Sequence, residues 1–96
     1  MLAVDESNLT TPHGITIPWR EIVAVHAERI DTHSGSIAMI TFDHVSGEIV
    51  EIPTDEDGFG MLRGRLAVYL PIPENWTQLV DDLPVRGAIT LMQRNH

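Results

Sequence analysis

The amino-acid sequence predicts an α+β fold in which a curved antiparallel sheet of about four to six strands packs against one helix. Three apolar runs rich in β-forming residues, 15–30, 37–43 and 48–53, are separated by polar turns. An amphipathic stretch over 55–70 follows them and ends at Pro71. Strands that come together before a helix, instead of alternating with helices, are typical of α+β architecture.

A chain of 96 residues forms one domain with one hydrophobic core. We expect residues 1–71 to supply the sheet and helix of that core, and residues 72–96 to form a C-terminal extension whose packing the sequence leaves open. The apolar stretches are shorter than the ~20 residues of a membrane span, and the first residues lack the basic and apolar regions of a secretory signal. We therefore expect a cytoplasmic protein.

Acidic residues outnumber basic ones, with 14 aspartates and glutamates against 6 arginines and no lysine, for a net charge of −8. A surface field of this sign repels phosphate groups, so we expect neither a nucleic acid nor a membrane surface as a partner. The acidity is either a common property of small soluble proteins or an adaptation to a cationic partner. The absence of cysteine excludes a disulfide scaffold and a thiol nucleophile.

The first part of the chain predicts short strands joined by tight turns. Candidate strands at 2–4, 9–11 and 15–17 are separated by polar residues that favour turns. Pro18 ends the third strand, because proline has no N–H to donate to a ladder.

A corner and a longer strand follow. Trp19 and Ile22 lie three residues apart, so a single helical turn places both on the core. The strand over 23–30 alternates, and His26 points away from its apolar face. That apolar face consists of Val23, Val25 and Ala27.

Two hairpins complete the sheet. A polar loop is expected at 31–36, and the run 37–42 is so apolar that it predicts a central strand covered at least partly on both faces. A Ser-Gly turn within 43–47 leads to the strand 48–53, which Pro53 ends.

The helix predicted over 55–70 begins with Thr54 or Asp55 as its cap. Gly60 and Gly64 each weaken it by about 1 kcal/mol relative to alanine. Its stability must therefore come from tertiary packing, unless the glycines allow a close approach of another backbone. The apolar stripe is Phe59, Leu62, Leu66, Tyr69 and Leu70.

The C-terminal extension allows two interpretations. Residues 74–83 form either a short second helix or a strand over 76–80. Residues 85–92 are either an edge strand or a tail that becomes ordered on a partner. In the helical interpretation one face carries Trp76, Leu79, Val80 and Leu83.

The sequence contains no motif of an active site. The histidines have no metal-ligand spacing, the carboxylates are scattered, and neither a phosphate-binding loop nor a G-x-S-x-G nucleophile turn occurs. Adjacent Asp43 and His44 indicate no acid–base pair. We therefore predict no enzyme, with no catalytic residue, no cofactor and no metal site. The residues proposed for an interface are Trp76, a partly exposed anchor, together with Ile89 and Leu91.

The run Gly14-Ile15-Thr16-Ile17-Pro18-Trp19-Arg20-Glu21-Ile22-Val23-Ala24-Val25 resembles the I-x-W-x-E-I-x-x-V entry of small bacterial PH-like domains. The later stretch from Asp57 to Pro71 resembles the helix that closes such a half-barrel. The resemblance covers residues 2–71 and implies a partial barrel, since about five strands precede residue 55 and a complete PH barrel has about seven. The loop 31–36 lacks the arginines and lysines that bind phosphoinositides in other PH domains, so lipid binding is not implied.

Two functions remain open from the sequence. The first is a non-catalytic module that binds a protein partner, or a second copy of itself, through an exposed sheet edge. The alternative is an immunity or inhibitor protein whose acidic face blocks a basic toxin or enzyme.

Overall fold

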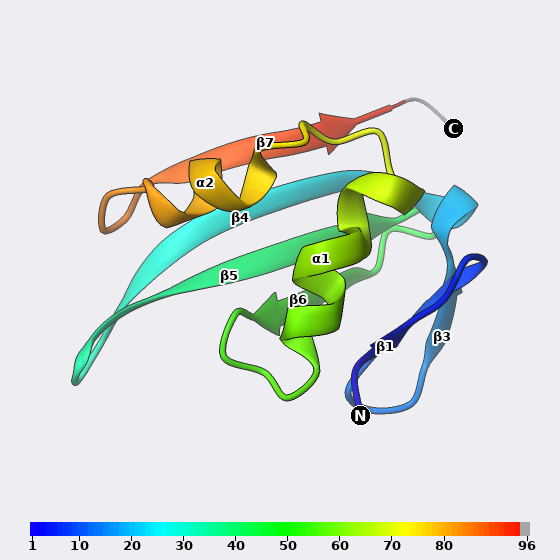
Figure 1. Cartoon of the computed structure of the whole chain (residues 1–96), viewed down its shortest axis with the longest axis horizontal. Helices are drawn as coiled ribbons and strands as arrows, with labels where there is room; N and C mark the ends of the chain where they lie inside the picture. The colour runs from blue at the N-terminus through cyan, green and yellow to red at the C-terminus, as the bar shows by residue number, and fades with distance from the viewer. Residues whose placement is uncertain (95–96) are drawn as a thin grey trace.

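The computed structural model describes residues 1–94, which form two antiparallel sheets and two α-helices (Figure 1). The predicted α+β class is confirmed, although the strands form two open sheets instead of one. The strand orders are β1-β2-β3 and β6-β5-β4-β7. In chain order the elements are β1 (Ala3–Val4), β2 (Asn8–Thr10), β3 (Thr16–Pro18), the 3-10 helix η1 (Trp19–Glu21), β4 (Ile22–Thr32), β5 (Gly35–His44), β6 (Ile49–Pro53), α1 (Phe59–Tyr69), α2 (Trp76–Asp81) and β7 (Ala88–Gln93).

The four-stranded sheet is built around the long hairpin of β4 and β5. The two strands are 11 and 10 residues long, and only His33 and Ser34 lie between them. The polar loop expected at 31–36 is therefore mostly strand, with Thr32 paired to Gly35. Gly35 adopts a φ of 142°, which lets the chain reverse within so short a loop. The hairpin predicted between β5 and β6 is confirmed.

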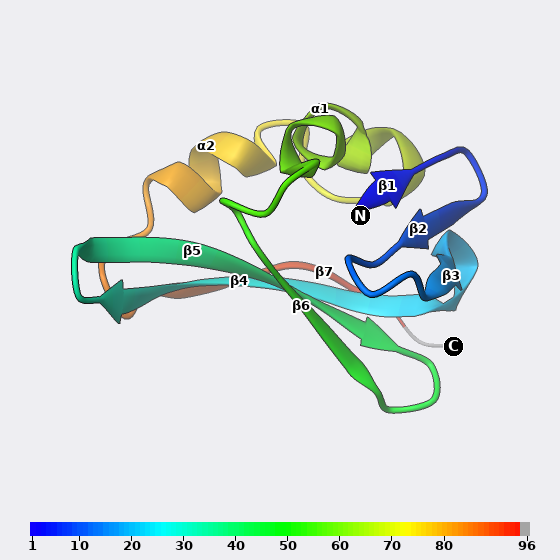
Figure 2. The same cartoon turned by 90° about the horizontal axis from the view of Figure 1, so that it is seen from below.

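One face of this sheet is covered and the other is open. Figure 2 shows α1, α2 and the small sheet on one side of the four-stranded sheet, with no other element of the described chain on the opposite side. The strand at 37–42 is central, as predicted, but Ile37, Met39 and Thr41 are only half-buried on the open face. The predicted cover is therefore complete on one face and only partial on the other. On the covered face the buried residues are Val25, Ala27, Ala38, Ile40, Phe42 and Ile52.

The corner between the two sheets has the predicted form. Trp19 begins a single 3-10 turn, Ile22 directly follows it, and both side chains are buried. The Trp19 ring stacks on Tyr69 with 5.2 Å between ring centroids. Val23, expected to face the core, is only half-buried, because the β4–β5 register shifts between Ile22 and Ala24.

Helix α1 begins at Phe59, four residues later than predicted, and neither Thr54 nor Asp55 caps it. Gly58 occupies the cap position with a φ of 90°, a left-handed conformation that favours glycine. A Cβ atom at Gly58 would lie 2.7 Å from the backbone oxygen of Leu2. The close backbone approach that was expected at Gly60 or Gly64 therefore occurs at Gly58. A Cβ atom at Gly60 or Gly64 would meet open space.

The C-terminal segment is part of the core. Residues 76–81 form a helix, not a strand, and residues 88–93 form an edge strand that pairs with β4. This settles both open interpretations in favour of ordered elements. The same core cluster that contains the sheet also includes Ile72, Trp76, Val80, Leu91 and Met92.

Two arginines fasten this segment to the sheet. The Nε atom of Arg29 donates to the carbonyl oxygen of Leu83 at 2.8 Å, and its Nη2 atom donates to that of Val80 at 3.0 Å. Val80 lies in the last turn of α2 and Leu83 lies just beyond the helix, and the Val80 oxygen also accepts the backbone N–H of Leu83 at 3.1 Å. Arg94 donates in the same way to carbonyl oxygens of η1 and of the first residue of β4, at 2.8 and 3.0 Å.

Replacing Gly58 by alanine is expected to lower the free energy of unfolding by about 2–3 kcal/mol, because alanine resists the positive φ and its Cβ would meet the Leu2 oxygen. The matched change Gly60→Ala should leave the free energy of unfolding unchanged or raise it by up to ~1 kcal/mol. Urea denaturation measures both. Equal effects of the two substitutions would contradict the assignment of Gly58 as the strained contact.

Replacing Arg29 by methionine is expected to destabilise the fold by about 1–3 kcal/mol, because the carbonyl groups of Val80 in α2 and of Leu83 after it lose a charged donor. Arg65→Met, on the exposed side of α1, is the control and should change stability by less than ~0.5 kcal/mol. Chemical denaturation followed by tryptophan fluorescence reports the difference, since Trp76 lies in α2. A loss no greater than that of the control would show that Arg29 does not hold the helix.

Candidate functional site

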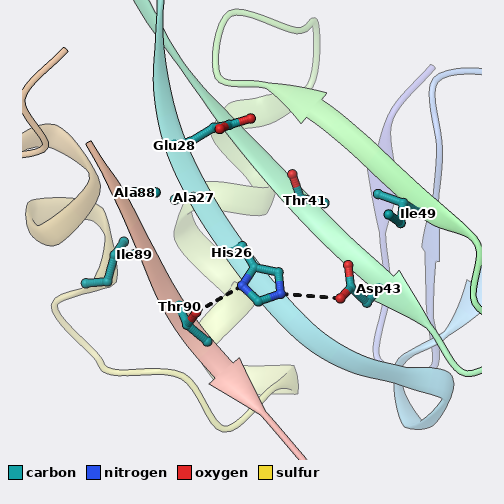
Figure 3. A pocket seen from close by; sticks show the side chains of 9 residues that line it. All are labelled: His26, Ala27, Glu28, Thr41, Asp43, Ile49, Ala88, Ile89 and Thr90. Atoms are coloured by element: carbon teal, nitrogen blue, oxygen red, sulfur yellow. Dashed lines mark hydrogen bonds and ion pairs between the residues drawn. The ribbon is translucent and has the colours of Figure 1, made fainter. Parts of the chain in front are cut away.

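The open face of the four-stranded sheet contains a shallow hollow (Figure 3). Its volume is about 470 Å3, and all four strands of the sheet contribute to its walls. The floor is formed by side chains of β4 and β5 that point away from the core. The lining residues are His26, Ala27, Glu28, Thr41, Asp43, Ile49, Ala88, Ile89 and Thr90.

His26 of β4 lies at the centre of this hollow and contacts the strands on both sides of β4, which are β7 and β5. Its Nδ1 atom is 3.0 Å from the Thr90 hydroxyl, and its Nε2 atom is 3.3 Å from Oδ2 of Asp43 (Figure 3). The expected orientation of His26, away from Val25 and Ala27, is confirmed. Sequence reasoning missed the partnership with Asp43, since it depends on the register of the β4–β5 hairpin.

The order hydroxyl, imidazole, carboxylate is also the order of a nucleophile, a general base and the group that orients it. In this chain, however, the His26 and Asp43 side chains are 36% and 34% exposed. They lie on an open sheet face where water competes for every hydrogen bond. The geometry therefore supplies polar groups for contact with a partner, in a hollow that does not shut out solvent.

A second histidine network lies at the turn between β5 and β6. Oε1 of Glu21 accepts a hydrogen bond from Nε2 of His44 at 2.8 Å, and Nδ1 of His44 accepts the backbone N–H of Ser46 at 3.1 Å. This pair, too, links segments that are far apart in sequence. His13 and His33 are exposed in turns, as expected, and His96 lies outside the described residues.

The residues proposed for an interface have different surroundings. Trp76 is 2% exposed and contacts Phe59 edge-to-face within the core, so the expectation of a partly exposed anchor is wrong. Leu91 is also buried, and Ile89 is half-buried against the core. The burial follows from the helical form of 76–81, which turns Trp76 toward the sheet. Ile89 and Leu91 belong to β7, and the accessible part of this strand is its outer backbone edge.

The two edges of the four-stranded sheet differ in protection. Strand β6 carries Glu51 and ends at Pro53, and both charge and proline discourage pairing at an edge. Strand β7, with the sequence Ala-Ile-Thr-Leu-Met-Gln, has no charged residue and no proline. It pairs with β4 on one side only. An irregularity opposite Val25 and His26 is one protective feature of this edge.

No group of three or more histidine, aspartate or glutamate side chains within residues 1–94 is placed to hold a metal ion. None of the helices in that same range has the length and apolar character needed to cross a membrane.

Comparison with models of protein families, with curated proteins and with solved structures finds no match to this chain. The resemblance to PH-like domains therefore stays a prediction, and function has to be argued from the molecule itself.

The His44 imidazole is expected to carry its proton on Nε2 in its neutral form, because Nδ1 accepts the Ser46 N–H and Nε2 faces the Glu21 carboxylate. Long-range 1H–15N correlation spectra of the imidazole distinguish the two tautomers. Exposed His33 is the internal control and should show no such fixed preference. A neutral His44 protonated on Nδ1 would contradict the turn geometry.

Proposed function

We propose that this protein is a non-catalytic interaction module that self-associates through β7. Two β7 strands placed antiparallel about a twofold axis join two four-stranded sheets into one continuous sheet. The observation that supports this proposal is the uncharged, proline-free sequence of an edge strand. Natural edge strands usually carry features that prevent such pairing.

The charge distribution supports edge-to-edge pairing over face-to-face pairing. The open face of the sheet carries Glu28, Asp43 and Glu51, so two such faces in contact would repel each other. Pairing at β7 keeps these carboxylates in solvent. It also matches the main-chain hydrogen bonds of one strand with those of the other, which needs no particular side chain.

A second function is favoured by those same carboxylates. The six arginines lie elsewhere in the molecule, on η1, β4, α1, the turn before β7 and the position after it. The side chain of Arg29 in β4 is directed to α2, on the covered face. An acidic open face is suited to a basic partner, as in an immunity or inhibitor protein. Association of that kind would weaken steeply with salt, whereas main-chain pairing of uncharged strands would not.

The double substitution Ala88→Lys with Gln93→Lys is expected to abolish self-association. In an antiparallel pair centred between positions 90 and 91, each new lysine faces a lysine of the other copy, and like charges opposite one another destabilise a sheet. Both positions are exposed in the monomer, so the fold should be retained. Multi-angle light scattering across protein concentration, at low and high salt, measures the change from dimer to monomer.

The matched control is Met61→Lys with Val68→Lys, which adds the same charge to exposed positions of α1. This variant should remain a dimer. A monomeric wild type at high micromolar concentration would overturn the proposal, as would dissociation caused by the α1 variant and not by the β7 variant.

A further inference from the structure

Strand register fixes which side chains the open face of the four-stranded sheet presents. The residues of β5 on this face alternate with the buried ones and are Ile37, Met39, Thr41 and Asp43. Glu28 of β4 pairs with Met39, and Glu51 of β6 pairs with Thr41. Paired residues lie on the same face of a sheet. The open face therefore has a row of β5 side chains with one glutamate on each side of it.

Much of this row is apolar. Ile37 and Met39 are half-buried by their neighbours within the sheet, with no other element of the described chain above them (Figure 2). Ile30 pairs with Ile37 and extends the apolar area onto β4. Ile49 pairs with Asp43 and is 60% exposed. Apolar side chains that remain in contact with water gain free energy when a partner covers them.

The open face offers side chains and no main-chain groups. Strands β4 and β5 are the two inner strands of the sheet, so each is paired on both sides. An extended segment lying on this face would bury main-chain groups without partners, whereas a helix satisfies its own. On the opposite face the same sheet already packs against α1 and α2 (Figure 2). A helix on the open face would complete a helix–sheet–helix arrangement.

The charge of the face is suited to arginine. Its carboxylates are Glu28, Asp43 and Glu51, and none of the residues that the register places on this face is an arginine. The basic side chain among them is His26, which already contacts Asp43 at 3.3 Å (Figure 3). Arginine binds carboxylates through two parallel hydrogen bonds, which makes it the preferred partner of such groups.

We infer that the open face binds an amphipathic helix of a basic protein partner, and that this helix lies along β5. The inference rests on the second proposed function, binding of a basic partner, and names the part of the partner that the face fits. The stretch from Ile37 to Asp43 is about 20 Å long, which matches a helix of about 14 residues. Neighbouring strands lie only about 4.8 Å away on each side, so the apolar stripe of the helix covers Met39 while its flanks reach Glu28 and Glu51.

The test uses a synthetic peptide of about 14 residues, acetylated and amidated, with a stripe of leucines, arginines on both flanks and alanine elsewhere. It is titrated into the 15N-labelled full chain at low salt. Amide signals of residues 26–30, 37–43 and 49–51 should shift in a saturable way, and circular dichroism should show a gain of helix. The same peptide with two interior alanines replaced by proline keeps its charge but loses the helix, and it should bind at least about tenfold more weakly.

A protein variant tests the charge pairs. Glu28→Gln with Glu51→Gln should weaken peptide binding about fivefold, because two charge pairs at exposed positions are lost. The matched control Glu6→Gln with Glu74→Gln removes the same charge from exposed positions between β1 and β2 and between α1 and α2. It should bind within about twofold of the wild type, since salt screens charges at that distance.

A second variant tests the apolar contact. Met39→Gln keeps the length of the side chain and should weaken binding about fivefold, because a polar group replaces the centre of the apolar row. Val68→Gln makes a comparable change on α1, where Val68 is 76% exposed, and should leave binding unchanged. Urea denaturation of both variants confirms that the fold is retained.

The possible failures point to different conclusions. Equal binding of the proline peptide at the same residues would overturn the helix and leave the second proposed function standing. No shifts on the open face with either peptide would overturn both. Equal weakening in a variant and its control would overturn the inference, as would shifts of residues 37–43 on raising protein concentration without peptide, which would assign the face to a second copy. Self-association through β7 is measured separately by light scattering, and its failure would leave this inference unchanged.

Discussion

The covered face of the β4–β5 hairpin is the constraint on which the rest of the structure depends. Phe42, Ile40 and Val25 on that face are almost completely buried beneath the helices. In the described chain the helices and the small sheet cover one face of the four-stranded sheet and leave the other open. The sheet therefore keeps an open face and open edges. Any partner of this protein meets those surfaces first.

The distribution of arginine follows from the same constraint. Covering the sheet with a short helix and a returning strand leaves helix-end carbonyl groups near the core, and such groups need donors. Arg29 donates to the carbonyl oxygen of Val80 in α2 and to that of Leu83 just after the helix. Arg94 donates to the carbonyl oxygens of Trp19 and Ile22, where the chain enters the larger sheet. Positive charge is thereby used to fasten the C-terminal segment, and no arginine lines the hollow of the open sheet face, where Glu28 and Asp43 lie. Part of the negative charge of the chain is therefore concentrated on the open face of the four-stranded sheet.

Periodicity predicted most elements of the fold, because alternation and helical spacing are local properties. The turn at Trp19 and the β5–β6 hairpin are examples. The start of α1 was wrong because it depends on Gly58, whose left-handed conformation accommodates the distant Leu2 backbone. The partnership of His26 with Asp43 was missed for a related reason. It requires the register of two strands, and a register shift in β4 is not visible in the sequence pattern.

The separation of the two sheets explains why binding is expected at edges. Pro18 cannot donate to a ladder, and the 3-10 turn after it redirects the chain before β4 begins. The small sheet is thus prevented from continuing into the larger one, and among the described residues the two sheets share no ladder. The strands at the two kinds of edge differ in composition. Uncharged β7 is suited to an identical strand, whereas Glu51 and Pro53 of β6 discourage pairing at the opposite edge. Pairing of this fold with a second copy is therefore expected at β7 and not at β6.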